Sequence, residues 1–274
     1  MATLARTQRR SGLSRRQKTQ LWRATQYAVF VAAVVLTALL ADWSVLTENF
    51  TRPEYARQMF PELVTVALRN TVVYTLAGFA FGLVLGLAVA LMRLSTAAPY
   101  RWAAMVYIEI FRGLPALVIF ILVGVGLPLA FPGLSFPGGT YGKVAFALGL
   151  VSAAYMAETI RAGIEAVPKG QMEAARSLGM SHGRAMRSIV IPQAFRIIIP
   201  PLTNELVLLF KDSSLVLFLG VSLGERELTK FGRDLASGTA NSTPIIVAGL
   251  TYLVITIPLG ALVRRLEAHN RKAR

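Results

Sequence analysis

The chain has no cysteine in its 274 residues and only two histidines, His182 and His269. Disulfides and thiolate metal sites are therefore excluded, and we interpret the two histidines as solvated side chains because both lie in polar stretches. The sequence also lacks a Gly-x-x-x-x-Gly-Lys-Ser/Thr phosphate loop, a metal-ligand cluster and any arrangement typical of a catalytic nucleophile. We expect no bound cofactor, no metal and no catalytic residue in this chain.

Acidic residues are scarce as well, with 14 Asp and Glu against 29 Lys and Arg. A net charge of +15 is compatible with nucleic-acid binding, but the basic residues border strongly apolar segments and form no separate domain. The composition is 54% hydrophobic with a mean hydropathy of +0.55, which is too apolar for a soluble domain of this size. The sequence therefore predicts a multi-span membrane protein in contact with lipid, with no nucleic-acid partner.

Six apolar segments are long enough to cross a hydrocarbon core of about 30 Å, which takes roughly 20 helical residues. We predict an all-α membrane protein of about six transmembrane helices, over residues 27–47, 63–92, 103–130, 143–160, 194–221 and 244–263. Residues 1–26 and 267–274 form basic tails. The first span is also compatible with a cleaved signal peptide, although no small-residue cleavage site follows it.

Lys and Arg are concentrated on one side of these spans, in both tails, in the loop after the second span and in the loop 161–192. The loops on the other side hold far fewer. By the positive-inside rule both termini and the loop 161–192 are expected in the cytoplasm.

Charged side chains inside apolar spans are costly and usually mark a functional position or an internal ion pair. Glu109 and Arg112 are three residues apart in the third span, and Glu158 and Arg161 repeat this spacing in the fourth. For Glu109 and Arg161 we favour an internal salt bridge. For Arg112 and Glu158 a salt bridge and a role in the substrate pathway both remain open.

The fifth span is the least lipid-like. Pro200 and Pro201 are expected to break its start, and four polar or charged residues follow, namely Asn204, Glu205, Lys211 and Asp212. We expect this span to face the protein interior, where it lines the substrate pathway or a subunit interface. For Asn204, polar contact between helices is an equally good interpretation.

A polar segment between the fourth and fifth spans has the residues of two short helices at a bend. Good helix formers run from Glu173 through Ala174 and Ala175, Gly179 stands at a helix end, and Ser181 is placed to cap a second helix. Such an element predicts a docking site for a soluble partner. The order Glu173-Ala174-Ala175, Gly179, Ile189 and Ile191-Pro192 resembles the coupling loop of bacterial ATP-binding-cassette importer permeases, with Ile191 in place of the usual Leu.

Further motifs follow in the order found in the polar amino-acid uptake branch of these permeases. They are Asn70-Thr71, Phe111-Arg-Gly-Leu-Pro115, Tyr155-Met-Ala-Glu-Thr-Ile-Arg161, Val167-Pro-Lys-Gly-Gln171, Asn204-Glu205 and Lys211-Asp-Ser-Ser-Leu215. The resemblance covers roughly residues 62–266 and implies a five-span permease domain, to which 27–47 adds an extra N-terminal span.

The resemblance further implies a permease subunit of an importer in the bacterial cell membrane. Its expected partners are two cytoplasmic ATP-binding subunits that hydrolyse ATP, a second permease of the same or a homologous kind, an external solute-binding protein and a polar amino acid. Glu173, Ala174, Ala175, Gly179 and Pro192 are expected to couple to the ATPase. The alternative is a self-sufficient secondary transporter that uses intramembrane carboxylates, although no internal repeat supports it.

Overall fold

A computed structural model of the chain describes residues 14–272, with side chains up to Ala268. This part of the chain consists of helices joined by turns and loops and contains no strand. It divides between Thr51 and Arg52 into two compact units, of which the second is much the larger. The expected all-α membrane architecture is therefore confirmed.

The N-terminal unit contains α1 (Arg15–Leu40) and α2 (Trp43–Phe50), and no residue of either helix is buried. The bounds of α1 differ from the span expected at 27–47. The helix already begins at Arg15, where Ser14 and Gln17 form a capping box, so residues 15–26 of the predicted tail are helical. It ends at Leu40 because Asp42 starts α2 by accepting hydrogen bonds from the N–H groups of Ser44 and Val45.

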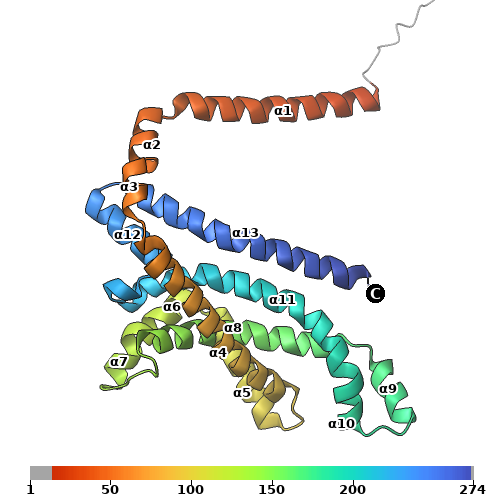
Figure 1. Cartoon of the computed structure of the whole chain (residues 1–274). Helices are drawn as coiled ribbons and strands as arrows, with labels where there is room; N and C mark the ends of the chain where they lie inside the picture. Colours follow the sequence, from red (N-terminus) through yellow and green to blue (C-terminus); the bar gives the residue numbers. More distant parts are fainter. Residues whose placement is uncertain (1–13, 273–274) are drawn as a thin grey trace, which may run out of the picture. The chain divides into compact units, whose positions relative to one another are not determined.

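The larger unit has eleven α-helices among its described residues, joined by short π-helical and 3₁₀ segments (Figure 1). In chain order the helices are α3 (Pro53–Gln58), α4 (Arg69–Leu94), α5 (Ala98–Gly113), α6 (Ala116–Ile121), α7 (Leu127–Ala130), α8 (Thr140–Glu165), α9 (Lys169–Ser177), α10 (His182–Ala185), α11 (Ile191–Asp212), α12 (Leu228–Thr239) and α13 (Thr243–Lys272). The 3₁₀ segments are Ser213–Leu219 and Leu223–Glu225; the π-helical turns are Leu63–Leu68, Leu122–Gly126 and Met186–Val190.

By length and hydropathy, four helices of the described residues are able to cross a membrane: Arg15–Leu40, Leu63–Leu94, Thr140–Glu165 and Thr243–Ala268. A fifth candidate is the pair Ala98–Gly113 and Ala116–Ala130, which bends by 104° at its break. The span expected at 103–130 corresponds to this bent pair. Leu114 is extended because Pro115 follows it, so α5 ends there and α6 starts in a new direction.

The fifth expected span, 194–221, corresponds to α11 and the 3₁₀ segment Ser213–Leu219. It is not among the helices that are long and apolar enough to cross a membrane by themselves, in keeping with its charged side chains. Pro200 and Pro201 do not break its start, since both lie inside a continuous helix, and that expectation is wrong. At the C-terminus, α13 runs on to Lys272, so the tail expected at 267–274 is helical over most of its length.

Helices α4 and α8 pack closely along their length, and three glycines of α4 make this possible. Gly78, Gly82 and Gly86 recur every four residues and are all buried against α8. A Cβ atom on Gly86 would lie only 2.9 Å from the carbonyl oxygen of Ala153. Small residues at this spacing let two helix backbones approach closely. The resulting pair forms the centre of the larger unit.

Candidate functional site: the coupling loop and the charged positions of α11

Helix α9 is closed by a glycine that adopts a left-handed conformation. Gly179 has φ = +82°, and its N–H donates to the carbonyl of Arg176 at 3.0 Å. The N–H of Met180 donates to the carbonyl of Ala175 at 3.1 Å. This pair of bonds is a Schellman motif, in which glycine is preferred because it has no Cβ atom to clash. The sequence correctly predicted the helix end at Gly179.

The second short helix, α10, begins where the sequence indicates. The Ser181 hydroxyl accepts the N–H of Arg184 at 3.4 Å and so caps α10 at its N-terminus. Pro192 lies in the first turn of α11, where its missing N–H costs no helical hydrogen bond. Figure 1 shows α9 and α10 as a bend beyond the ends of α8 and α11. The expected pair of short helices at a bend is therefore present.

The inner face of this loop is packed into the core that also holds α8 and α11. Val167 and Val190 belong to a buried cluster with Ala157 and Ile160 of α8, and Met172 packs against it. Ala175 is 5% exposed. A movement of the loop would therefore displace the spans, because closely packed side chains transmit displacement.

The outer face of α9 is free. Glu173 and Ala174 are exposed, and the Leu178 side chain is 85% exposed. An apolar side chain held rigidly on a polar surface suits contact with another protein. The structure separates Ala175, which points inward, from Glu173 and Ala174, which point outward.

The charged residues of α5 and α8 pair only in part as expected. Arg161 binds Glu158 through its Nε atom at 2.7 Å and also binds Glu165, so this salt bridge is present. Among the described residues no ion pair joins Glu109 to Arg112. The Arg112 guanidinium instead lies over the Tyr155 ring, 5.4 Å from its centroid.

The two acidic residues of α11 have no partner in the described part of the chain. Glu205 and Asp212 are half-buried, and no ion pair or hydrogen bond of theirs is found there. They are seven residues apart, so they lie on one helix face two turns from each other. Asn204 and Lys211 are exposed on the same helix. The structure therefore places two acidic side chains that form no ion pair among the described residues on one face of α11.

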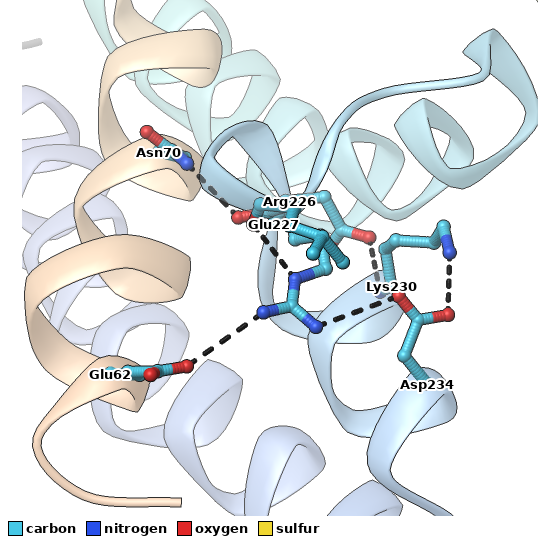
Figure 2. A network of polar contacts seen from close by, with 7 residues as sticks. Glu62, Asn70, Arg226, Glu227, Lys230 and Asp234 are labelled. Carbon is cyan, nitrogen blue, oxygen red and sulfur yellow. Dashed lines mark hydrogen bonds and ion pairs between the residues drawn. The ribbon is translucent and has the colours of Figure 1, made fainter. Parts of the chain in front are cut away.

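A polar network at the other end of the bundle was missed by sequence reasoning (Figure 2). Asn70 of α4 donates to the carbonyl oxygens of Gly224 and Arg226, at 2.9 and 3.1 Å. The Arg226 guanidinium lies 3.7 Å from Glu62 and 3.8 Å from Asp234. These contacts fix the segment between α11 and α12 against α4. Asn70 was noted only as part of a motif, and nothing in the sequence places it beside residues more than 150 positions away.

Glu227 is the most deeply buried acid of this network, at 0% exposure. Its carboxylate accepts the N–H groups of Thr229 and Lys230, both at 2.6 Å, and thereby caps α12. Burial raises the pKa of Glu227 to about 7, and the hydrogen bonds from Thr229, Tyr252 and Lys230 act in the opposite direction. Near it, a hydrogen bond from Ser222 lowers the pKa of Glu225.

The apolar helices long enough to cross a membrane, the bent helix pair and the glycines of α4 buried against α8 define a multi-span membrane protein. Residues 82–272 match the family described as the inner membrane component of binding-protein-dependent transport systems. The chain belongs to this family.

Several curated proteins that are similar to the chain are permeases. The chain is 37% identical over 257 residues to the arginine transport system permease protein ArgU of Corynebacterium glutamicum, covering 89% of this chain and 80% of that protein. It is 40% identical to the probable glutamine ABC transporter permease protein GlnM of Bacillus subtilis, covering 74% and 91%. These relatives place the chain among the amino-acid ABC transporter permeases and confirm the resemblance seen in the sequence.

A solved structure agrees with this membership. The chain is similar to a crystal structure of an amino acid ABC transporter with histidines, with a TM-score of 0.69 and 35% identity, covering 78% of this chain and 96% of that one. The inward-facing MetNI methionine ABC transporter shares the fold, with a TM-score of 0.62 at 20% identity. The findings support an importer permease and do not support a self-sufficient secondary transporter.

Proposed function

We propose that this chain is the permease subunit of an ATP-driven importer for amino acids with a cationic side chain. The observation that carries the substrate class is the pair Glu205 and Asp212, two half-buried acidic side chains on one face of α11 that make no hydrogen bond or ion pair in the described part of the chain; the neighbouring Lys211 interacts with Asp212 electrostatically. A carboxylate in such a place is stabilised by a passing cation. Two relatives with 37% and 38% identity are arginine permeases, which agrees with this assignment.

Arg112, Lys211 and Asn204 complete the proposed pathway. A zwitterion also carries a carboxylate, and Arg112 of α5 and Lys211 of α11 are exposed cations that suit it. Glu158 has a different role in this proposal, because Arg161 already neutralises it. It holds the end of α8 in position, one turn before the coupling loop begins.

The coupling loop is proposed to bind a cytoplasmic ATP-binding subunit through Glu173, Ala174 and Leu178, with Ala175, Gly179 and Pro192 holding its shape. Two such subunits, a second permease and an external solute-binding protein complete the assembly. ATP-driven closure of the two ATPases would displace the loop, and with it α8 and α11, between inward-open and outward-open states.

Uptake by proteoliposomes that contain the complete importer tests the substrate class. Arginine and lysine are expected to compete with uptake of labelled arginine more strongly than glutamine does, and glutamate is expected not to compete. Glu205→Gln and Asp212→Asn are each expected to lower arginine uptake about tenfold or more, because each removes a charge that faces the cation. Strong competition by glutamate, or unchanged uptake in both variants, would contradict the proposal.

The proposed orientation has both termini and the coupling loop in the cytoplasm. Since the chain has no cysteine, a single introduced thiol reports its side of the membrane without background. Ser177→Cys in α9 is expected to react with an impermeant maleimide only in inverted vesicles, and Ser222→Cys near α12 only in right-side-out cells. The reverse labelling pattern would place the loop outside and overturn the ATPase-coupling role.

A further inference from the structure

Helix α1 of the N-terminal unit carries its charged residues at one end only. Arg15, Arg16, Lys18 and Arg23 are exposed, and none of them forms an ion pair among the described residues. The sequence contains no acidic residue before Asp42. The four side chains therefore carry positive charge that no group of their own helix neutralises.

The rest of α1 is an apolar section that these cations border. No charged residue lies between Ala24 and Leu40, and at 1.5 Å per residue this section is about 25 Å long. The hydrocarbon core of a bilayer is about 30 Å thick. When the apolar section crosses the core, Arg23 lies at one surface and α1 continues for about two turns beyond it.

A tryptophan stands at each end of the apolar section. Trp22, next to Arg23, is 65% exposed, and Trp43, just after the other end, is 59% exposed. Tryptophan is enriched at membrane–water interfaces, where its amphipathic ring lies at the headgroup level. The two ends differ in charge, because Trp22 lies among cations whereas Trp43 directly follows Asp42, the N-cap of α2.

The cations and Trp22 share one side of the helix. At about 100° per residue, Arg15, Lys18 and Trp22 fall within about 60° of one another around the axis. Arg16 and Arg23 adjoin them at about 80–100° from Arg15. The opposite side is uncharged and carries Gln17, Gln20, Leu21 and Ala24. The first turns of α1 thus present one continuous positive surface that ends at the membrane.

Distance along the axis decides which of these cations meet lipid headgroups. The headgroup layer adds about 5–7 Å to each side of the hydrocarbon core. Lys18 lies about 7.5 Å beyond Arg23 along the axis, and a long basic side chain can extend its charge back toward the interface. Arg15 and Arg16 lie about 3–5 Å further out than Lys18 and act on the headgroups within a Debye length of about 8–10 Å.

We propose that residues 15–23 of α1 form a binding surface for anionic phospholipids. Lys and Arg donate charge-assisted hydrogen bonds to phosphate oxygens, and basic residues beside a membrane are attracted to its anionic lipids. Trp22 places its ring among the same headgroups. The extra N-terminal span thereby gathers anionic lipid around itself, a role that depends neither on the transported substrate nor on the coupling loop.

Quenching of Trp22 fluorescence by brominated lipid measures which lipids surround this surface. The chain has three tryptophans, so Trp43→Phe with Trp102→Phe leaves Trp22 alone in the full-length protein. Two vesicle preparations contain equal amounts of phosphatidylglycerol and phosphatidylcholine and differ only in which lipid is brominated. The ratio of phosphatidylglycerol to phosphatidylcholine around Trp22 is expected to be about 2–5, up to the effect of one basic side chain near an anionic surface.

Neutral substitutions locate the charges that produce this preference. Lys18→Gln with Arg23→Gln is expected to bring the ratio close to one. Arg15→Gln with Arg16→Gln is expected to lower it less, because these residues lie further from the headgroups. Salt at 1 M shortens the Debye length to about 3 Å and is expected to lower the native ratio. Vesicles in which both lipids are brominated show whether each variant inserts like the native chain.

Trp43 is the matched control within the same unit. Trp22→Phe with Trp102→Phe leaves Trp43 at the end of the apolar section that has no cation beside it, and its lipid ratio is expected to be about one. An equal preference for phosphatidylglycerol at Trp43 would assign the effect to the protein as a whole and overturn the inference.

The inference is also overturned if the ratio at Trp22 is one, or if neither the loss of Lys18 and Arg23 nor salt changes it. In the first case the positive surface has another anionic partner. If Lys18→Gln with Arg23→Gln is quenched less than the native chain when both lipids are brominated, its helix has not inserted. Arg15→Gln with Arg16→Gln then decides, because its substitutions lie outside the membrane, and an unchanged ratio in that variant contradicts the proposal.

Discussion

The double variant Glu173→Lys with Gly179→Pro is expected to abolish ATP-driven uptake and to lose the ATP-binding subunit during purification. Glu173 is exposed on the outer face of α9, so a lysine there reverses the charge that meets the partner. Proline cannot adopt the φ of +82° found at Gly179 and has no N–H to donate to Arg176.

The strain at position 179 sets the expected size of the effect. A residue forced into an unsuitable backbone conformation costs about 1–3 kcal/mol. In a loop of two short helices, a free-energy cost of this size leaves most molecules with a distorted α9. Because the charge at position 173 is reversed as well, arginine uptake is expected to fall at least about tenfold. The measurements are arginine uptake in proteoliposomes and the amount of ATP-binding subunit that co-purifies from the membrane.

Gly183→Ala is the control in the same loop. A Cβ atom at Gly183 would meet nothing within 4 Å, and its φ is not left-handed. This variant is expected to show native ATP-driven arginine uptake and to co-purify with the ATP-binding subunit. If the double variant still transports and still co-purifies with the ATP-binding subunit, α9 does not couple the permease to the ATPase. If Gly183→Ala also loses uptake and the partner, the effect reflects destabilisation of the whole loop by any substitution.

Gly86→Ala is expected to lower the stability of the whole permease. Its Cβ atom would lie 2.9 Å from the backbone oxygen of Ala153 and 3.0 Å from the Cβ atom of Met156, so α4 and α8 must move apart. Overpacking of this kind typically costs about 1–3 kcal/mol. The expected result is an unfolding midpoint several degrees lower in detergent, measured by intrinsic fluorescence, together with a smaller yield of monodisperse protein.

Gly249→Ala is its matched control, because a Cβ atom at Gly249 of α13 meets nothing within 4 Å. Both changes gain the same helix propensity of about 1 kcal/mol, so the difference between the two variants isolates the clash. If both have the same midpoint, the close approach of α4 to α8 contributes nothing to stability.

Local features were predictable because they depend on residues close together in the chain. Gly179 at a helix end and Ser181 as a cap follow from conformational preferences of single residues, and the Glu158–Arg161 pair follows from helical spacing. The four-residue repeat of Gly78, Gly82 and Gly86 identified a packing face, although the sequence did not say which helix it meets. The helix bounds were less accurate, since the capping box at Ser14 extends α1 well beyond its apolar part.

The angle between α5 and α6 and the path of α11 were not predictable from local rules. Pro115 indicated a kink, but a bend of 104° depends on how the following helices pack. Pro200 and Pro201 suggested a break, yet a helix held by neighbours on its other faces continues through both residues.

The sequence by itself determined the class of the protein, the approximate place of its apolar segments, its loop of two short helices and its family, because these depend on hydropathy, local helix preferences and motifs along the chain. Only the tertiary structure decided that Ala175 faces inward, that Arg112 lies over Tyr155, and that Glu205 and Asp212 make no ion pair or hydrogen bond among the described residues. It alone joined Glu227 to Tyr252 and Asn70 to Arg226. The physical reason is that such contacts join residues far apart in the chain, and their partners are set by helix packing, which no local preference encodes.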